Sequence, residues 1–189
     1  VSGIAAARGS VPSGPMIASG PLFFGVAEKP LYGFLHEPAT EAAKGNTLIL
    51  VPPIGPEAIR QHRAIRQMAV SAVRGGMRVL RFDFRGHGDS AGAARDVAMR
   101  EWIEDVVAAR AEVARSFTGP RISIVAWGFG AIVAHLALAG EDVADFALVD
   151  APTNGATFWT DLEARHRQNA RATAARWPDA ASTGPFDLL

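Results

Sequence analysis

Three loops, each following a run of apolar residues, hold the side chains and amides in this sequence that could do chemistry. Residues 83–90 read Asp-Phe-Arg-Gly-His-Gly-Asp-Ser, a glycine-rich turn with one histidine and two carboxylates. Such a turn could bind a metal ion, cradle a phosphate or simply reverse the chain. It lacks the Lys-Ser/Thr ending of a phosphate-binding loop, and one histidine beside carboxylates is a weak zinc ligand set. We therefore expect no metal site.

The second loop, residues 51–57, reads Val-Pro-Pro-Ile-Gly-Pro-Glu and joins a strand-like segment to a helix-like one. Backbone N–H groups near the start of a helix can bind an oxyanion. Pro53 and Pro56 have no N–H, which leaves the amides of Ile54 and Gly55 as donors. The other interpretation is a rigid turn made by the prolines.

The third loop, residues 125–131, reads Val-Ala-Trp-Gly-Phe-Gly-Ala and predicts a sharp turn from a strand into a helix. This is the geometry of a nucleophile elbow, G-x-S-x-G, in which small residues flank a serine. Here Ala126 and Gly130 occupy the flanking positions and Gly128 occupies the central one. Because the hydroxyl is missing, a serine mechanism cannot run at this position.

Hydrophobic periodicity indicates which elements must position these loops. An extended pair at residues 22–27 and 31–36 predicts a hairpin, and apolar runs predict buried strands at 47–51, 77–82, 121–126 and 144–149. Helical spacing predicts helices at 57–74, 96–117 and 129–139, the last with His135 in the core. Alternating strands and helices build a doubly wound, mostly parallel α/β sheet, and ligands bind where its strands end.

The chain of 189 residues has the length of one domain. Residues 1–20 read as a loose leader rich in Gly, Ser and Pro, and residues 21–150 as the α/β core. After Asp150 the pattern changes to a helical segment rich in Arg, which also carries His166. We interpret residues 151–189 as a helix that lies over another part of the molecule.

Composition and charge exclude several classes of function. With 19 basic and 19 acidic residues the net charge is zero, so we expect no nucleic-acid partner. The absence of cysteine excludes disulfides, thiolate nucleophiles and Cys-ligated zinc. Residues 122–140 carry no Lys, Arg, Asp or Glu, but their glycines and histidine favour a strand and a helix over a membrane span. Without a secretory apolar region near residue 1, we expect a cytoplasmic protein.

The segments PPIGPE, RFDFRGHGDSAG and VAWGFGA, in this order, resemble the first two thirds of an α/β-hydrolase. The segment DFRGHGDS is similar to the loop after the fourth strand in serine-aminopeptidase-like and lysophospholipase-like members. The layout also resembles α/β-hydrolases associated with exosortase and exopolysaccharide systems. The resemblance covers residues 22–150, and residues 150–189 are similar to the start of a cap. It implies the first six strands of an α/β-hydrolase fold and the beginning of a helical cap.

The resemblance also implies a reaction and a set of site residues. The family reaction is hydrolysis of an ester, amide or thioester bond in a small acyl-type substrate, without a cofactor. By resemblance, the amides of Ile54 and Phe129 form the oxyanion hole, and Gly128 stands at the nucleophile position. The loop residues Arg85, Gly86, His87 and Gly88 would shape the pocket.

The rest of the family's catalytic triad is expected to be absent. Family members carry the acid after a seventh strand and the histidine after an eighth, and this chain ends before either. Asp150 is a weak candidate for the acid, although a polar residue that closes a strand is the preferred interpretation. We expect His166 to lie at the surface or to pack in the cap.

Three hypotheses follow from the sequence. The chain is a hydrolase whose site is degenerate or completed by sequence outside it, or it is a non-catalytic module that binds a ligand or a protein. The third hypothesis is a truncated product in which residues 144–149 form an exposed edge strand. Such an edge could pair with another chain, including a second copy.

Overall fold

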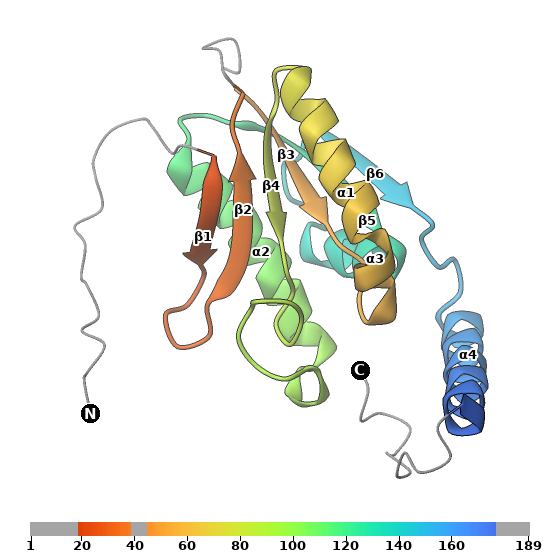
Figure 1. The fold of residues 1–189 in the computed structure, drawn as a ribbon. Coiled ribbons are helices and arrows are strands. Elements are labelled where there is room, and N and C mark those ends of the chain that lie inside the picture. Colours follow the sequence, from red (N-terminus) through yellow and green to blue (C-terminus); the bar gives the residue numbers. More distant parts are fainter. Residues whose placement is uncertain (1–18, 39–44, 177–189) are drawn as a thin grey trace, which may run out of the picture.

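A six-stranded mixed sheet forms the centre of the molecule (Figure 1). The structure is a computed structural model and describes residues 19–38 and 45–176. The spatial order of the strands is β1-β2-β4-β3-β5-β6. Their bounds are β1 Gly20–Phe24, β2 Leu31–His36, β3 Asn46–Val51, β4 Arg78–Phe82, β5 Arg121–Trp127 and β6 Asp145–Val149.

The pairing confirms the hairpin and the parallel sheet expected from the sequence. Strands β1 and β2 form the antiparallel hairpin, and β2 also pairs antiparallel with β4. The pairs β3–β4, β3–β5 and β5–β6 are parallel. Because strands β3 to β6 run in one direction, the loops that follow them gather at one edge of the sheet.

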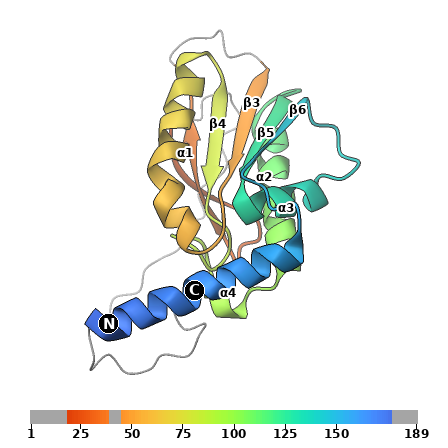
Figure 2. The same cartoon turned by 90° about the vertical axis from the view of Figure 1, so that its right-hand side faces the viewer.

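Helices cover the sheet from both sides (Figure 1; Figure 2). Helix α1 (Pro56–Arg74) packs on one face, and helices α2 (Met99–Ser116) and α3 (Gly128–Ala137) pack on the other. Helix α4 (Gly155–Arg176) follows β6 and crosses the edge where the parallel strands end. A short 3₁₀ turn, Ala94–Asp96, precedes α2, which begins three residues later than its periodicity suggests.

Strand β3 lies between two separate apolar clusters. Its residues Leu48 and Leu50 face α1, whereas Ile49 and Val51 face α2 and α3. The cluster on the α1 face consists of Leu48, Leu50, Ile65, Ala69, Val79 and Trp127. The cluster on the other face is larger and includes Leu80, Phe84, Val106, Ile124 and Val133. A strand buried on both faces reads as a continuous apolar run, which is why residues 47–51 could be recognised.

Two expectations about burial were wrong. His135 is exposed on α3 and stacks on Phe146 with the ring centroids 6.4 Å apart, so it is not a core residue. Strand β6 is largely exposed, because in the described part of the chain it pairs only with β5 and α3 is the one helix that packs closely against it.

Several expectations fall outside the described residues. This group contains residues 1–18 of the leader expected at 1–20, residues 177–189 of the expected cap and the side chain of His166. Within the described ranges, none of the helices has the length and apolar character needed to cross a membrane.

Candidate functional site

The candidate site is built on the turn between β5 and α3, where no loop separates strand from helix. Strand β5 ends at Trp127 and α3 begins at Gly128, whose φ of +52° is in the left-handed region. A Cβ added at this position would meet only the Cβ of Pro53, at 3.4 Å. The position therefore has room for a small side chain, and it lacks a nucleophile because its residue is glycine.

Gly130 holds the loop after β3 against this turn. A Cβ at position 130 would lie 2.0 Å from the carbonyl oxygen of Pro52, which no side chain tolerates. The absence of a side chain thus lets the 52–56 loop approach the first turn of α3. Both segments that carry the expected oxyanion donors meet here.

Two backbone amides at this junction are free to bind an anion. Phe129 is the second residue of α3, so its N–H has no acceptor within the helix. The N–H of Ile54 donates no hydrogen bond to any described residue. The N–H of Gly55, the other donor that the sequence offered, is occupied because it donates to His87 Nε2 at 2.9 Å. The available pair is therefore Ile54 and Phe129.

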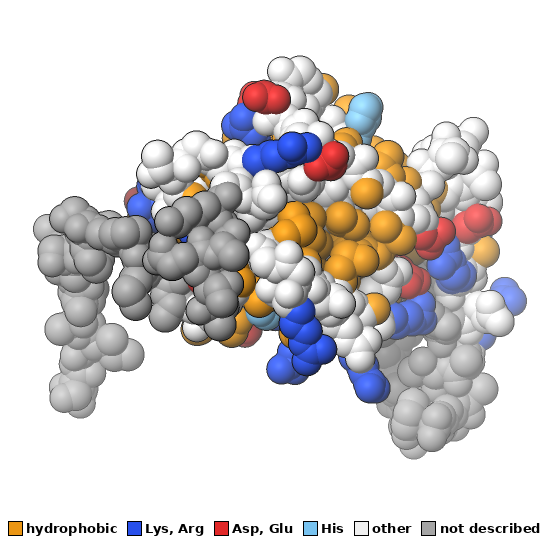
Figure 3. Space-filling view, turned by 90° about the horizontal axis from the view of Figure 1, so that it is seen from above, with side chains coloured by type: hydrophobic (Ala, Val, Ile, Leu, Met, Phe, Trp, Pro, Cys, Tyr) orange, Lys and Arg blue, Asp and Glu red, His pale blue; other side chains and the backbone are white. Residues whose placement is uncertain are grey.

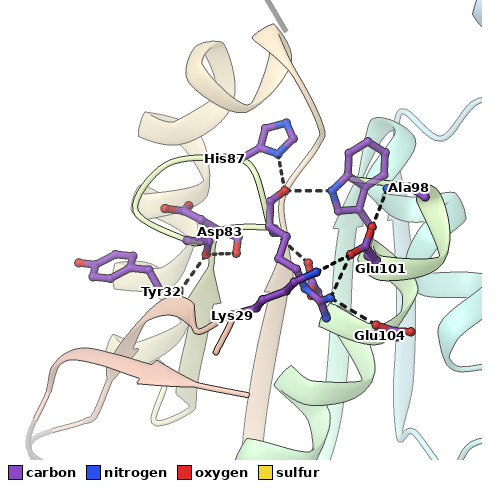
Figure 4. A network of polar contacts seen from close by, with 11 residues as sticks. Lys29, Tyr32, Asp83, His87, Ala98, Glu101 and Glu104 are labelled. Atoms are coloured by element: carbon purple, nitrogen blue, oxygen red, sulfur yellow. Dashed lines mark hydrogen bonds and ion pairs between the residues drawn. The ribbon is translucent and has the colours of Figure 1, made fainter. Parts of the chain in front are cut away.

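His87 joins the 83–90 loop to the 52–56 loop through its two ring nitrogens. Figure 4 shows its contact with the backbone of the 83–90 loop. Because Nε2 accepts from Gly55, the ring proton of the neutral imidazole resides on Nδ1, which lies 3.2 Å from the carbonyl oxygen of Arg85. The ring also contacts Trp102 edge-on, with the centroids 5.9 Å apart. Both ring nitrogens have hydrogen-bond partners, so His87 links the two loops.

Arg85 is buried and pairs with Asp105 of α2. Its Nε donates to Asp105 Oδ1 at 2.5 Å and its backbone N–H donates to Asp105 Oδ2 at 2.9 Å. Asp105 is fully buried, and burial raises the pKa of its carboxyl group, while the N–H groups of Arg85 oppose that rise. Trp102 Nε1 donates to the carbonyl oxygen of Arg85 at 3.1 Å. This network fixes the loop on α2.

Helix α4 covers the elbow through an aromatic contact. Phe158 of α4 stacks on Phe129 with the ring centroids 5.4 Å apart and the planes inclined by 22°. On its other side Phe129 meets Trp102 edge-on at 6.5 Å. Arg165 of α4 also lies 3.5 Å from Glu57 of α1. A ligand at the elbow would thus have apolar aromatic rings beside the two free amides.

Asp150 comes to the same edge of the sheet. Trp127 pairs with Val149, so Asp150 is the next position along β6, as Gly128 is along β5. Its φ of +52° makes it the one described non-glycine residue with a positive φ. The side chain is exposed and makes no hydrogen bond or ion pair with a described residue.

Neither serine that lies near the sheet replaces the missing nucleophile. Ser90 donates to the carbonyl oxygen of Asp83 and accepts from the N–H of Tyr32, and Ser123 donates to Asp145 at the far end of β5. Among the described residues, no three His, Asp or Glu side chains are grouped as metal ligands would be.

A cavity of about 760 Å³ lies beside the elbow, on the α1 face of the sheet. Gly86, His87 and Gly88 line it, whereas Arg85, Gly128 and Phe129 do not. Sequence reasoning missed Arg81, which lines this cavity, and Asp105, which pairs with Arg85. Both residues are charged and stand at positions where the apolar pattern of the segment predicts burial, and this could have marked them in the sequence.

The strand order and the left-handed turn between β5 and α3 define an α/β-hydrolase fold. The sequence model of the "Alpha/beta hydrolase family" matches residues 48–189, which is more than half of the chain. The chain belongs to the α/β-hydrolase family. No protein with a curated function matches the sequence.

Solved structures show the same fold. An α/β serine hydrolase homologue from Coxiella burnetii is 19% identical over 75% of this chain and 67% of its own, with a TM-score of 0.62. A serine hydrolase without lid from Xanthomonas campestris is 22% identical over 77% of this chain and 66% of its own, with a TM-score of 0.65. An esterase from Pyrococcus furiosus is 20% identical over 82% of this chain, with a TM-score of 0.62. The chain spans about two thirds of the length of the first two and 59% of the third.

Proposed function

We propose that this chain is a pseudohydrolase that binds the carbonyl or carboxylate end of a small acyl-type ligand and does not hydrolyse it by a serine mechanism. The observation that carries the proposal is Gly128 at the nucleophile position. A ligand oxygen would accept hydrogen bonds from the amides of Ile54 and Phe129, which have no other acceptor among the described residues. The rings of Phe129 and Phe158 would contact the ligand's apolar part.

The second candidate is the family reaction, hydrolysis of an ester, amide or thioester bond, at a degenerate site or one completed by further sequence. The left-handed turn and the room at position 128 favour it, because the backbone of a working elbow is retained. Asp150 is the residue best placed to act as its acid, since it ends the strand beside the elbow.

We propose in addition a subgroup of the family, a class of ligand, a cellular setting and a division of the chain into core and cap. The DFRGHGDS loop supports a serine-aminopeptidase-like subgroup, and the zero net charge supports a small-molecule ligand over nucleic acid and a cytoplasmic setting. Residues 21–150 would form the hydrolase core, with residues 151–189 as the start of a cap.

A fluorophosphonate probe separates the two candidates, because it labels an activated serine whatever the natural substrate is. We expect neither labelling nor ester hydrolysis above the background rate. The Gly128→Ser variant is expected to remain a poor esterase, because both ring nitrogens of His87, the histidine of the loop beside the elbow, already have hydrogen-bond partners. Labelling of the unchanged chain, or strong turnover by Gly128→Ser, would favour the hydrolase candidate.

Binding is tested by following the backbone amide signals in an NMR titration with octanoate. The amides of Ile54 and Phe129 should shift the most. Phe129→Pro removes one donor at a helix position where proline is tolerated, and a hydrogen bond to a charged group is worth about 1.5–3 kcal/mol. We expect at least a tenfold loss of octanoate affinity for Phe129→Pro, and a smaller loss for Phe129→Leu, which keeps the N–H. Unmoved Ile54 and Phe129 amides would contradict the proposal.

A further inference from the structure

The cavity on the α1 face is a second site, distinct from the elbow. Its volume, about 760 Å³, lies within the range of small-molecule sites. It lies between the first half of α1, the first part of β2, the end of β4 and the 52–56 loop, whose Pro53 also lies beside Gly128 of the elbow. Gly128, Phe129 and Phe158, which form the elbow, are not part of its lining.

The walls of this cavity are mostly apolar and aromatic. Tyr32 and Phe34 of β2 face α1 from one side, and Ile59 and Ile65 of α1 face them from the other. Ile59 is 82% exposed, so an isoleucine stands at the cavity's edge without packing partners of its own. A large apolar side chain in that position would gain contacts from a ligand with an apolar body.

Arg81 places a positive charge among the apolar side chains that line this cavity. Its guanidinium is partly buried, lies 5.7 Å from the ring centroid of Phe34, and donates from Nε to His36 Nε2 at 2.9 Å. In the described ranges no carboxylate lies within ion-pair distance, and both Nη atoms lack an acceptor. Burial is the main factor that lowers the pKa of Arg81. A planar anion could accept from the free side of the guanidinium.

The acidic residues of the lining restrict which anion fits. Asp83 and Asp89 belong to the same cavity, with Asp83 accepting a hydrogen bond from the backbone N–H of Asp89 at 3.2 Å. Their charges would repel a dianion such as phosphate more strongly than a monoanion. Arg66 is close enough to act electrostatically on Arg81 and His36, and it adds a second positive charge near the cavity.

We propose that this cavity binds a monocarboxylate with an aromatic or short aliphatic body, with the carboxylate on Arg81 and the body between Tyr32, Phe34 and Ile59. Because the 52–56 loop forms one wall of this cavity and also packs on the elbow through Pro52 and Pro53, the ligand would contact the loop that carries the Ile54 amide. The site does not depend on the proposed function of the elbow.

Calorimetric titration with phenylacetate tests the proposal, with phenylacetamide as the neutral isostere and inorganic phosphate as the dianion. We expect phenylacetate to bind and the amide to bind at least tenfold more weakly. Arg81→Met should reduce the affinity for phenylacetate at least tenfold, whereas Arg63→Met, which removes an exposed arginine of α1 outside this cavity, should not change it. Equal affinities for acid and amide, equal affinities of the Arg81→Met and unchanged proteins, or phosphate binding as tight as phenylacetate would overturn it.

A second pair of variants separates binding at this cavity from misfolding and from binding at the elbow. Ile59→Asp changes an exposed residue, so it leaves the core intact, and its negative charge at the edge of the cavity should weaken phenylacetate binding several-fold. Phe129→Pro should leave phenylacetate binding unchanged while it weakens octanoate binding at the elbow. Loss of phenylacetate binding in Phe129→Pro, with Ile59→Asp unaffected, would place the ligand at the elbow instead.

Discussion

His36 and Arg81 face each other from neighbouring strands, and their hydrogen bond requires a neutral histidine. Arg81 Nε donates to His36 Nε2 at 2.9 Å, so that nitrogen cannot carry a proton of its own. Burial, followed by the charges of Arg81 and Arg66, lowers the pKa of His36 from 6.5 to about 4. Protonation would break the hydrogen bond and place a second cation beside the guanidinium.

This pair predicts a loss of stability in mild acid. Between pH 6.5 and about 4 the unfolded chain binds more protons at His36 than the folded chain does, so the free energy of unfolding falls as the pH falls. After allowance for solvent screening we expect His36 to contribute about 1–2 kcal/mol of this loss. Urea titrations at pH 7 and pH 4.5 should show a smaller difference for His36→Gln than for the unchanged chain. The exposed His135→Gln serves as the control, and identical pH profiles for His36→Gln and the unchanged chain would contradict the prediction.

Site residues could be predicted from the sequence where a local backbone turn defines their position. They could not be predicted where their role depends on contacts between side chains far apart in the sequence. The elbow could be read from Gly128 and its small neighbours, because a local turn has a local pattern. The residues alone left the choice between the Ile54 and Gly55 amides open, and only the family resemblance favoured Ile54. The physical reason is a hydrogen bond from Gly55 to His87, 32 positions away, which no local pattern shows. Arg81 and Asp105 were missed for the same reason.

Among the elements, β3 and β6 show what an apolar run predicts and what it leaves open. Both runs were recognised as strands, and both are strands. Only β3 is buried on both faces, since it has a neighbour on each side and helices above and below. An apolar run indicates the conformation of a segment, whereas its burial depends on neighbours that another part of the sequence supplies.

The attachment of α4 to the elbow depends on Phe158. Its stacking on Phe129 is an aromatic contact, worth about 0.5–1.5 kcal/mol beyond the buried area. The ion pair between Arg165 and Glu57 joins two side chains that are both at least a third exposed, so it contributes little. Phe158→Ala should therefore speed amide hydrogen exchange along α4 about tenfold, while exchange in α1 to α3 stays unchanged. Trp159→Ala, at a position that is 50% exposed, is the control. Unaltered protection of α4 in Phe158→Ala would show that other contacts hold it.

At the scale of the whole molecule, apolar surface is left open to solvent. Figure 3 shows a continuous hydrophobic area on the upper side, with charged side chains around it. At the β6 end of the sheet, Leu148 is 48% and Val149 is 37% exposed, and the outer backbone groups of β6 pair with no described strand. Unpaired N–H and C=O groups beside apolar side chains form a template on which another strand can pair.

We therefore expect the chain of 189 residues, studied by itself, to self-associate through β6. Sedimentation velocity over a range of concentrations should show a reversible shift toward dimers. Leu148→Lys should weaken the association at least tenfold, because a symmetric pairing of two β6 edges brings the two new charges close together. Leu136→Lys is a matched control, since Leu136 is 49% exposed but lies on α3. A chain that stays monomeric at every concentration would contradict pairing through β6, and an equal effect of the two lysine variants would place the contact on a general apolar surface instead.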